Sequence, residues 1–362
     1  MRAAIVRAPG EGFCIEDVQL AEPGRREIIV DVKASGLCHS DIAIAQEGRG
    51  FQMPILLGHE VAGTVSEIGA EVQSVSIGDR IVVSMVAGCN RCVQCSKGKP
   101  FRCEQVSSLE RAANDPPRVT RDGEAVTQFM GVGGFAEKVL IHENFAVPIG
   151  NDIPFDVASL LGCGVLTGAG AAINTAGVRP GDTVAVIGCG GVGLNTIQGA
   201  RIAGASRVIA VDLQPAKLEL AREFGATDVV CSAEGDPVEA VHELIGGVDY
   251  SFEVVGLQPT AEQALRMLRV GGTALLIGVQ RPDTKLDLDL FSDIIWPQRR
   301  VLGVSMGSSN PRVDIPMFAE LYRQDRLELD ALVSEHISLE EIDEAYRRVA
   351  SGSVARAVIT SF

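Results

Sequence analysis

The sequence predicts an α/β protein that combines a mostly antiparallel β domain with a doubly wound parallel sheet. Up to about residue 150, short β-type runs are separated by turn residues, whereas from Thr183 onward apolar strands alternate with helical stretches. The length of 362 residues also exceeds the size at which one hydrophobic core normally stops growing. We therefore expect one domain at residues 1–164 and 308–362 and a second domain at residues 165–307.

The first domain is predicted from short strands with glycine, proline and acidic turns between them. The opening segment MRAAIVRAPG predicts a strand, and the further β-type runs are EIIVDV, GTVSEI, DRIVVS and AEKVLI. Residues 108–128 are polar, contain prolines and have no clear period, so we expect a surface loop there.

The second domain is predicted from six strands: TVAVIG, RVIAVD, DVVC, SFEVVG, TALLIGV and RVLGVS. Helices are expected near residues 191–204, 215–225 and 259–269, and this alternation is typical of a parallel doubly wound sheet. From about residue 308 the chain returns to isolated helices near 314–325 and 338–351. We expect this tail, which ends in the strand ARAVITSF, to pack on the first domain.

Charge and composition argue against several classes of function. A net charge of −15 repels phosphate backbones and acidic lipid surfaces, which disfavours nucleic-acid and membrane partners and leaves small molecules as ligands. We see no signal-peptide pattern and no uninterrupted apolar run long enough to span a bilayer, so we expect a cytoplasmic protein. In that compartment nine cysteines favour metal binding or catalysis over disulfides.

Four cysteines near residues 88–104 have the spacing of a structural zinc site. The pattern C-x2-C-x2-C-x7-C in GCNRCVQCSKGKPFRC brings four thiolates within reach of one tetrahedral ion. Four thiolates leave no open coordination position, so this zinc would stabilise the lobe and do no chemistry. Two disulfides or an iron–sulfur cluster are the alternatives. The ligands are Cys89, Cys92, Cys95 and Cys103.

Three residues far apart in the sequence form a second candidate metal site: Cys38 in GLCHSD, His59 in GHE and Cys163 in LGCGV. A lone cysteine is more often a small buried hydrophobe than a ligand. Glycines flank all three residues, as expected where turns bring side chains from separate segments together. One imidazole and two thiolates leave the fourth zinc position open for water or substrate, which is the arrangement of a catalytic site.

A glycine-rich turn predicts a dinucleotide site. Gly188, Gly190 and Gly193 form a G-x-G-x-x-G pattern between an apolar strand and a helix, where the backbone can approach a pyrophosphate, as in a Rossmann fold. Nineteen residues after Gly193, Asp212 can accept hydrogen bonds from the adenosine ribose and repel a 2′-phosphate, which favours NAD over NADP. A similar pattern at residues 131–136 precedes a strand-like run and is rejected.

Several motifs, in the same order, resemble the zinc-containing alcohol dehydrogenases of the medium-chain dehydrogenase/reductase superfamily. They are GLCHSD, GHEVAGTVSEIGAEV, the four-cysteine lobe, LGCGVLTG and SGSVARAVITSF, and they span nearly the whole chain. The resemblance implies a GroES-like catalytic domain, a Rossmann NAD-binding domain, two zinc ions per chain and a homodimer or homotetramer. It further implies an oxidoreductase that reversibly transfers a hydride between an alcohol and NAD.

The resemblance also implies site residues. Cys38, His59 and Cys163 are the implied catalytic zinc ligands, and Glu60 could exchange onto the metal or be a salt-bridged loop residue. Asp41 matches the carboxylate that hydrogen-bonds the metal-bound imidazole, and Ser40 matches the hydroxyl that takes the alcohol proton, although either could cap a turn. Many relatives end this proton relay in a histidine where this chain has Ala43. The implied cofactor contacts are His39, Thr167, Gly188, Gly190, Gly191, Val192, Gly193, Asp212, Lys217, Ile277, Gly278, Val279 and Arg356.

Individual cofactor roles follow from the same resemblance. Lys217 would lie near the adenosine ribose, while His39 and Arg356 would lie near the pyrophosphate. The nicotinamide would contact Thr167, Val192 and the stretch 277–279. A solvated surface charge is the alternative for Lys217 and Arg356, and a cap of the strand-to-helix turn is the alternative for Asp212.

Two other functions stay open. LGCGVLTGAGAAINTAGV also resembles thiol-adduct formaldehyde dehydrogenases, which depend on mycothiol or glutathione, and the arginines at 111, 118 and 121 could hold such an adduct or be solvated. A non-catalytic protein with the same fold is the second alternative. For an alcohol dehydrogenase, an apolar pocket at Met85, Phe129 and Met130 would favour a primary, medium-chain or aromatic alcohol. The strands TALLIGV and VLGVSM are candidates for subunit pairing.

Overall fold

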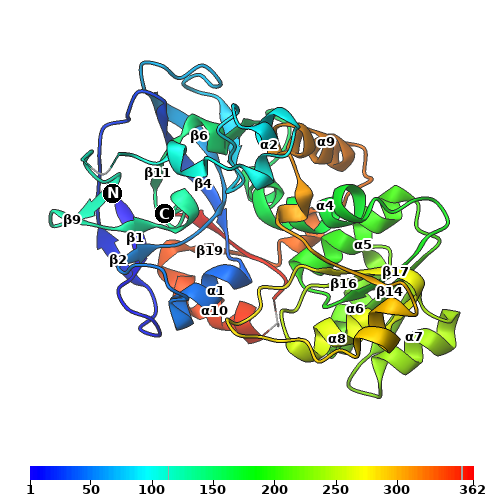
Figure 1. Cartoon of the computed structure of the whole chain (residues 1–362). Helices are drawn as coiled ribbons and strands as arrows, with labels where there is room; N and C mark the ends of the chain where they lie inside the picture. Colours follow the sequence, from blue (N-terminus) through cyan, green and yellow to red (C-terminus); the bar gives the residue numbers. More distant parts are fainter. Residues whose placement is uncertain (113, 352–353) are drawn as a thin grey trace. The chain divides into compact units, whose positions relative to one another are not determined.

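The computed structural model describes residues 1–112, 114–351 and 354–362. Two segments named in the sequence analysis contain residues outside these described ranges. Ala113 lies in the predicted loop, and Gly352 and Ser353 lie in the C-terminal motif SGSVARAVITSF. The described chain folds as two units, drawn in Figure 1 and described one at a time below.

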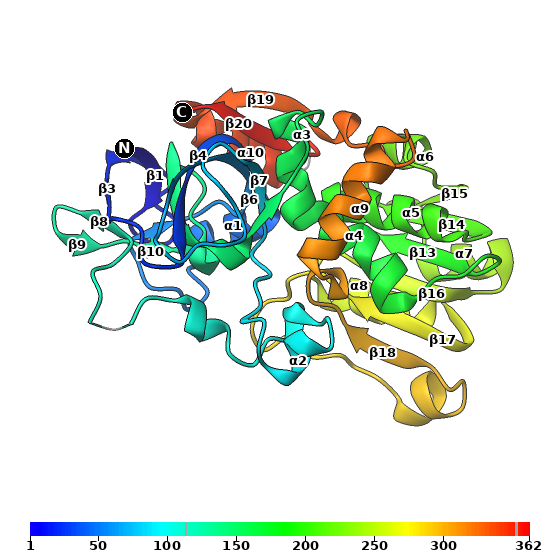
Figure 2. The ribbon, with the colours of Figure 1, turned by 90° about the horizontal axis from the view of Figure 1, so that it is seen from above.

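The first unit, Met1–Gly164 with Asn310–Phe362, contains a large sheet around the long strand β4 (Glu27–Gly36). β4 is rich in β-branched residues and pairs antiparallel with three neighbours. The sheet order is β12 (Ala146–Pro148), β7 (Arg80–Val83), β6 (Glu60–Ile68), β4, β20 (Ala357–Ser361) and β19 (Glu335–Ser338), with β11 (Lys138–His142) also paired to β4. Because β20 pairs with β4, the tail completes the sheet of the first unit, as expected (Figure 2).

Two smaller sheets and several helices complete this unit. One sheet has the order β10 (Thr127–Gln128), β5 (Ile55–Leu56), β1 (Arg2–Val6) and β2 (Cys14–Asp17). The other has the order β3 (Gln19–Leu20), β8 (Val119–Arg121) and β9 (Glu124–Ala125). The helices are α1 (His39–Glu47), α2 (Val93–Ser96), α3 (Phe155–Leu160), α9 (Pro311–Arg323) and α10 (Ile342–Ser351). Buried aliphatic and aromatic side chains, among them Ile5, Leu37 and Phe135, form the core.

The expected loop at residues 108–128 is partly wrong. Its second half forms β8, β9 and β10, and β8 pairs antiparallel with β3. These strands are only two or three residues long, so neither hydrophobic periodicity nor β-propensity could reveal them. β8 and β10 pair with the distant strands β3 and β5, whereas β9 forms a short hairpin with β8.

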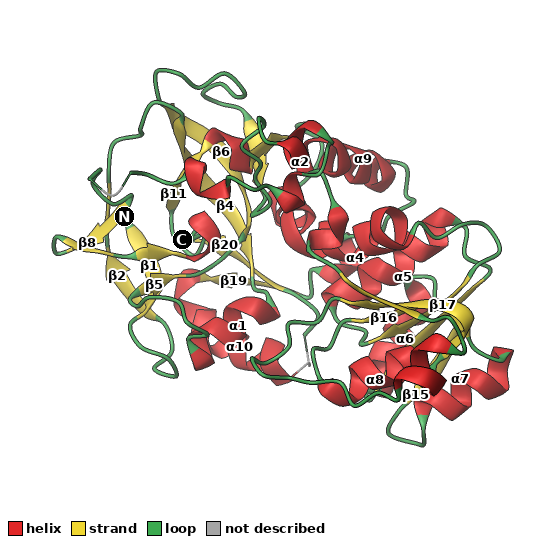
Figure 3. Ribbon diagram, in the orientation of Figure 1, coloured by secondary structure: helices red, strands yellow, loops and turns green. Residues whose placement is uncertain are grey.

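The second unit, Val165–Ser309, is a six-stranded parallel sheet. Its order is β15 (Asp228–Cys231), β14 (Arg207–Asp212), β13 (Thr183–Ile187), β16 (Val248–Glu253), β17 (Leu268–Leu276) and β18 (Arg300–Gly303). The order reverses at β13, which is the doubly wound Rossmann arrangement with its switch point between β13 and β16. The sheet carries helices on both faces (Figure 3). They are α5 (Gly191–Ala203), α6 (Pro215–Glu223), α7 (Pro237–Ile245) and α8 (Gln258–Arg266).

Helix α7 was not expected, although a local signal for it exists. Pro237 occupies the first helical turn, and the Asp236 side chain accepts a hydrogen bond from the Val238 backbone N–H at 2.8 Å. An aspartate N-cap followed by proline is a helix-start signal. With α7 in place, a helix connects β15 to β16 in the doubly wound sheet.

A run of helical turns over Phe155–Ala176 is long and apolar enough to cross a membrane by length and composition, but 89% of its most apolar window is buried inside the protein. That burial is the packing of a core helix. Asp156, Thr167 and Asn174 interrupt the run, so it does not contradict the expectation that no uninterrupted apolar run is long enough to span a bilayer. The run contains α3, the π-helical turn η5 (Leu161–Val165), α4 (Leu166–Gly170) and the π-helical turn η6 (Ala171–Ala176).

Candidate active site

Cys38 lies at the N-cap of α1, directly after the long strand β4. Asp41, three residues on, turns its carboxylate back toward this cap, and its Oδ2 accepts a hydrogen bond from the Cys38 backbone N–H at 3.3 Å. This reciprocal arrangement is a capping box, and it fixes the helix start at which Cys38 is presented. Asp41 thus caps α1, which was the alternative to its role beside the imidazole. The same carboxylate also contacts His59.

His59 precedes β6 and is held through the same carboxylate. Asp41 Oδ1 lies 3.1 Å from His59 Nδ1 and accepts the Gly58 backbone N–H at 3.0 Å. Gly58 has a φ of 91°, and a Cβ there would come within 2.6 Å of the Phe135 backbone nitrogen, so the position needs glycine. Because Nδ1 donates to Asp41, Nε2 is left to face Cys163 Sγ and Ser40 Oγ, each at 3.3 Å.

Four potential ligand atoms meet in this buried cluster. The ligand atoms of Cys38, His59, Glu60 and Cys163 all lie within 4.8 Å of one another, and all four residues are buried. Cys163 comes from the π-helical turn η5, a local geometry that is frequent at functional sites. Glu60 is the first residue of β6 and pairs in register with Gly36 of β4.

Glycines and an arginine enclose the Glu60 carboxylate. A Cβ on Gly36 would come within 2.5 Å of Glu60 Oε2, and one on Gly164 would come within 3.1 Å of Arg356 Nη2. The Arg356 guanidinium donates to Glu60 Oε1 at 3.2 Å and lies 3.9 Å from Cys38 Sγ. Glu60 Oε2 is buried and has no hydrogen-bond partner among the described residues. A buried orphan carboxylate oxygen is costly unless a further group satisfies it.

The protonation of the cluster is strongly perturbed. The hydrogen bond from Cys163, opposed by burial and supported by Arg356, holds the pKa of the Cys38 thiol well below its ordinary value. The same hydrogen bond and burial raise the pKa of Cys163. Burial would lower the pKa of His59, but the Asp41 carboxylate outweighs it and raises that pKa well above the ordinary value. Burial raises the pKa of Glu60 to about 7.

This donor set fits a zinc ion. Two sulfurs, one imidazole nitrogen and one carboxylate oxygen are the ligand types that zinc takes, and their mutual distances allow one tetrahedral site. The Cys38 thiolate is already favoured, and a cation would displace the proton of Cys163, as metal binding does in thiol-rich sites. The Asp41 contact supplies the outer carboxylate that orients a ligating imidazole.

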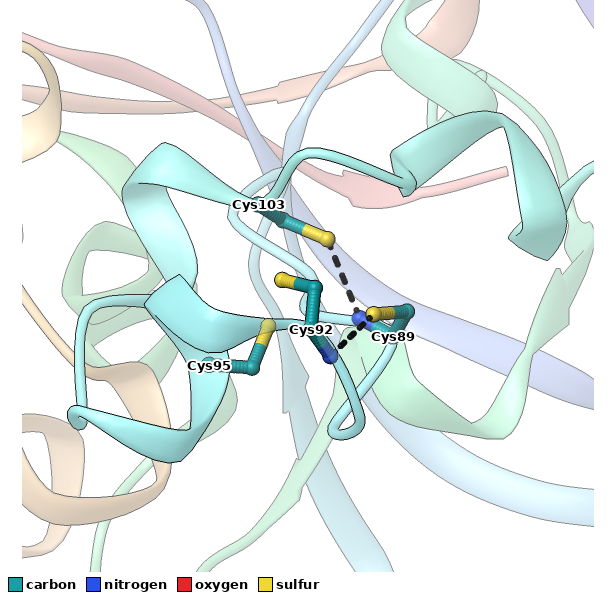
Figure 4. A group of neighbouring side chains, drawn as sticks. All are labelled: Cys89, Cys92, Cys95 and Cys103. Atoms are coloured by element: carbon teal, nitrogen blue, oxygen red, sulfur yellow. Dashed lines mark hydrogen bonds between the residues drawn. The ribbon is translucent and has the colours of Figure 1, made fainter.

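The four-cysteine lobe forms a second cluster. The sulfurs of Cys89, Cys92, Cys95 and Cys103 lie within 4.8 Å of one another, and Figure 4 shows them converging from a loop and short helical turns. The Cys89 N–H points to Cys103 Sγ and the Cys92 N–H to Cys89 Sγ, both at 3.3 Å. Backbone N–H groups around Cys95 and Glu104 lower the pKa of Cys92 to about 6. All nine cysteines lie in the described residues and are free thiols.

The glycine-rich turn lies at the carboxyl end of β13. Gly188 has a φ of 100°, and a Cβ on Gly193 would stand 1.8 Å from the Gly188 carbonyl oxygen, so both positions require glycine. Helix α5 begins at Gly191, and its first N–H groups and dipole make an anion-binding end. Asp212 at the end of β14 accepts the N–H of Cys189 at 2.8 Å and that of Gln214 at 3.0 Å. It therefore caps the strand-to-helix turn and keeps acceptor capacity for a further partner.

The remaining predicted cofactor residues fall in both units. In the second unit Thr167 is buried and donates to Met306 Sδ at 3.5 Å, while Val192 on α5 and Lys217 on α6 are half-buried. Ile277 and Gly278 follow β17 and donate their N–H groups to the Glu253 carbonyl, and Val279 is exposed. In the first unit His39 is exposed at the first turn of α1. Arg356 is 3% exposed, so it is not a solvated surface charge.

Comparisons with known proteins agree with this geometry. Residues 24–151 match the model described as an alcohol dehydrogenase GroES-like domain, and residues 191–322 match a zinc-binding dehydrogenase. The chain is 34% identical to S-(hydroxymethyl)glutathione dehydrogenase of Synechocystis sp. over 99% of both proteins. It is 35% identical to NDMA-dependent alcohol dehydrogenase of Amycolatopsis methanolica, covering 99% of this chain and 98% of that relative.

A solved structure is similar over the whole chain. Benzyl alcohol dehydrogenase from Acinetobacter calcoaceticus superposes with a TM-score of 0.92 at 32% identity, covering 100% of this chain and 99% of that one. The chain belongs to the zinc-containing alcohol dehydrogenase family. It is therefore an oxidoreductase of the medium-chain dehydrogenase/reductase superfamily, with the GroES-like and Rossmann folds that the sequence predicted.

In this zinc-containing alcohol dehydrogenase, the three loop arginines form ion pairs with carboxylates of the first unit. Arg111 and Arg118 donate to the buried carboxylate of Glu27, at 2.6 and 2.7 Å, and Arg121 forms an ion pair with Glu16. Arg111 and Arg118 are therefore largely buried against Glu27, whereas the Arg121 side chain stays 37% exposed. Although burial opposes ionisation, the two guanidinium groups hold the pKa of Glu27 at about 2. A carboxylate 80 residues or more away in sequence could not be inferred from the arginine spacing.

Two further features of the site were missed by sequence reasoning. The first is the contact of Arg356 with Glu60 and Cys38, which joins residues about 300 positions apart. The second is the aromatic surrounding of His59: the Phe129 ring lies 5.5 Å from the imidazole, and Phe51 lies 5.1 Å from Phe129. Of the expected pocket residues, Phe129 is buried, Met85 is half-buried and Met130 is exposed. No sequence pattern marks Phe51.

Proposed function

We propose that this protein is an NAD-dependent alcohol dehydrogenase that reversibly transfers a hydride between a primary alcohol and NAD. The observation that supports the proposal most is the buried cluster in which Cys38, His59 and Cys163 bring three zinc-type ligand atoms together. Membership in the zinc-containing alcohol dehydrogenase family supports the same reaction class.

Each residue of the cluster has a role in this proposal. Cys38, His59 and Cys163 would hold the catalytic zinc, and the orphan oxygen of Glu60 would exchange with the alcohol at the fourth position. When bound, zinc supplies the Lewis acid that polarises the alcohol oxygen, and NAD supplies the hydride acceptor. Asp41 keeps the His59 tautomer whose Nε2 faces the cluster.

Ser40 is the proposed proton acceptor for the alcohol hydroxyl. Its Oγ lies 3.3 Å from His59 Nε2 in the first turn of α1, within reach of a group that occupies the open ligand position. Ala43, one turn further along α1, carries no ionisable group. The proton therefore leaves through water or through the exposed imidazole of His39.

The proposed NAD site uses the glycine turn at the start of α5. Gly188, Gly190 and Gly193 allow the pyrophosphate to approach, with Gly191 and Val192 supplying backbone at the helix end. Asp212 accepts from the adenosine ribose, which selects NAD over NADP. The other proposed contacts are His39, Thr167, Lys217, Ile277, Gly278, Val279 and Arg356.

A second zinc is proposed in the four-cysteine lobe. Its four sulfurs lie close together without disulfides, which supports a closed structural site and makes two zinc ions per chain. Nine free thiols in one chain are typical of a reducing compartment, so we propose a cytoplasmic location. Accordingly, residues 1–164 and 308–362 would be the catalytic domain and 165–307 the NAD-binding domain.

The test of this function is a panel of alcohols and aldehydes assayed by NADH absorbance, with NADP in parallel. The proposal expects NAD reduction by primary alcohols and a lower rate with NADP. If no alcohol or aldehyde changes the NADH signal in the zinc-loaded protein, the proposed reaction is wrong.

A thiol-adduct formaldehyde dehydrogenase is the second candidate, and the S-(hydroxymethyl)glutathione dehydrogenase relative favours it. The ion pairs of Arg111 and Arg118 with buried Glu27 argue against these two residues as the ones that hold the adduct. A formaldehyde assay with and without glutathione or mycothiol separates the two functions. An obligatory thiol requirement would replace the first proposal by this one.

A further inference from the structure

Three rings lead from buried His59 toward the protein surface. The Phe129 ring meets the His59 imidazole edge to face with centroids 5.5 Å apart, and the Phe51 ring meets Phe129 in the same manner at 5.1 Å. His59 is fully buried, Phe129 is 4% exposed and Phe51 is 36% exposed. The two phenyl rings therefore form a continuous apolar row beside the imidazole, and the outer ring is open to solvent.

The loop after α1 fixes the position of Phe51. Gly48, Arg49 and Gly50 all have left-handed backbone angles, with φ values of 69°, 43° and 83°. A Cβ on Gly48 would stand 2.9 Å from Pro9 Cγ in the same unit. The Phe51 N–H donates to the Gly48 carbonyl at 2.9 Å, which closes the turn. The aromatic side chain thus extends from a defined backbone and stays partly exposed.

A second exposed apolar side chain lies beside the same ring. Met130 follows Phe129 in the 3₁₀ turn η3 (Phe129–Gly131), is 43% exposed and has φ and ψ of 52° and 28°. This left-handed conformation is uncommon for such a side chain, and backbone strain of this kind clusters at ligand sites. Phe51, through its ring contact, and Met130, as the next residue in the chain, thus add exposed apolar surface next to Phe129.

We propose that Phe51 is a specificity-determining residue that favours aromatic alcohols over short aliphatic ones. The inference rests on the proposed function, because it concerns the alcohol that is oxidised near His59. An aryl group on the carbinol carbon can reach the Phe129 and Phe51 rings and meet them edge to face, a geometry that aromatic pairs prefer. A short alkyl group ends before Phe51 and gains nothing from it.

The experiment compares the wild type with Phe51→Ala and Phe51→Leu, using benzyl alcohol and 1-propanol with NAD. The ratio of the two kcat/KM values should fall on the order of tenfold in Phe51→Ala and less in Phe51→Leu, with the 1-propanol value nearly unchanged. Ile68→Ala is the matched control, because Ile68 is an apolar residue of similar exposure, 37%, at the end of β6 in the same unit. An unchanged ratio in Phe51→Ala, or an equal fall in the control, overturns the proposal.

A binding readout separates this proposal from the reaction itself. Line broadening of the ¹⁹F signal of 4-fluorobenzyl alcohol reports binding without turnover and should weaken in Phe51→Ala but not in Ile68→Ala. If the wild type oxidises no alcohol with NAD or NADP, the proposed function fails. The broadening still decides the role of Phe51, since equal broadening in the wild type and Phe51→Ala contradicts it.

Discussion

Asp41 links three parts of the candidate metal site through one carboxylate. It accepts the backbone N–H groups of Cys38 and Gly58 and contacts His59 Nδ1. Its side chain is fully buried, so none of these contacts is shared with solvent. The orientation of the imidazole is therefore set at the scale of a single residue.

Asp41→Asn should weaken catalysis and zinc affinity while preserving side-chain shape. Loss of the charged partner that orients a ligating imidazole typically costs roughly 10–100-fold in metal affinity or activity. Zinc titration and kcat/KM measure both effects. Asp156→Asn is the matched control, because Asp156 contacts the exposed His336 imidazole at 2.7 Å outside the cluster. Equal losses in the two variants would show that Asp41 has no special role.

Asp212 is the residue that we propose selects the cofactor, again at the scale of a single side chain. Asp212→Gly removes the negative charge expected to repel the 2′-phosphate of NADP, so the NADP-to-NAD ratio of kcat/KM should rise. The variant also loses the acceptor for two backbone N–H groups, at Cys189 and Gln214. Asp212→Asn retains an acceptor and controls for that structural loss. An unchanged ratio in both variants would show that another group selects the cofactor.

At the scale of elements, Glu27 ties the segment after the cysteine lobe to β4. Its carboxylate joins Arg111 and Arg118, and the pKa of Glu27 falls from its ordinary value to about 2. A carboxyl whose pKa is lowered by folding stabilises the fold above its unfolded pKa. That contribution is present near neutral pH and is lost as pH falls from about 4.5 toward 2.

Glu27→Gln should destabilise the protein by about 3 kcal/mol near neutral pH, because it leaves two largely buried guanidinium groups without their anion. Thermal unfolding at several pH values measures the effect. The difference in Tm from the wild type should narrow as pH drops below about 4. Glu71→Gln, which alters the exposed pair with Arg25, should change Tm little at any pH. A constant Tm difference across pH would contradict this account.

Strand β18 is the outer edge of the parallel sheet, beyond β17 (Figure 2). All four of its residues are exposed, including Val301 and Leu302. The nearby turn η7 (Leu290–Ile295) adds exposed Leu290, Phe291 and Ile295, followed by exposed Trp296. An unpaired edge with apolar neighbours favours pairing with another chain, so we propose that two copies of β18 pair in a homodimer or in a homotetramer built from such dimers.

Leu302→Lys together with Val301→Glu should therefore shift the protein toward monomer. Charged side chains on an edge strand oppose edge-to-edge pairing. Sedimentation velocity measures the mass of both forms. Val270→Lys, at an exposed apolar position next to Gly271 in β17, is the control and should leave the mass unchanged. A wild type that sediments as a monomer would refute the pairing.

At the scale of the whole molecule, the features that could be predicted from sequence are those that local spacing and hydrophobic periodicity determine. The four-cysteine lobe, the glycine turn and the strands of the parallel sheet follow from short segments, and the structure brings the four sulfurs together. Residue types and flanking glycines made Cys38, His59 and Cys163 a candidate site, but their assignment as ligands of one zinc came from family resemblance, because a separation of more than 100 residues between His59 and Cys163 carries no local signal. Fold class and family membership are confirmed.

The features that were missed depend on tertiary pairing. Arg356 and Glu60, Arg118 and Glu27, and Phe51 and Phe129 meet only after distant strands and loops have packed. Short elements such as β8, β9 and β19 form because a partner strand is present, and their own sequences are too brief for periodicity. Helix α7 is different, since its N-terminal Asp236 and Pro237 gave a usable signal.

The most direct test of the whole account is zinc content measured together with alcohol-dependent NAD reduction in the wild type and in Cys38→Ser. The account predicts two zinc ions per chain in the wild type, one in the variant, and loss of NAD reduction while thermal unfolding remains cooperative. Alcohol-dependent NAD reduction that persists in the variant after verified loss of that metal would contradict it.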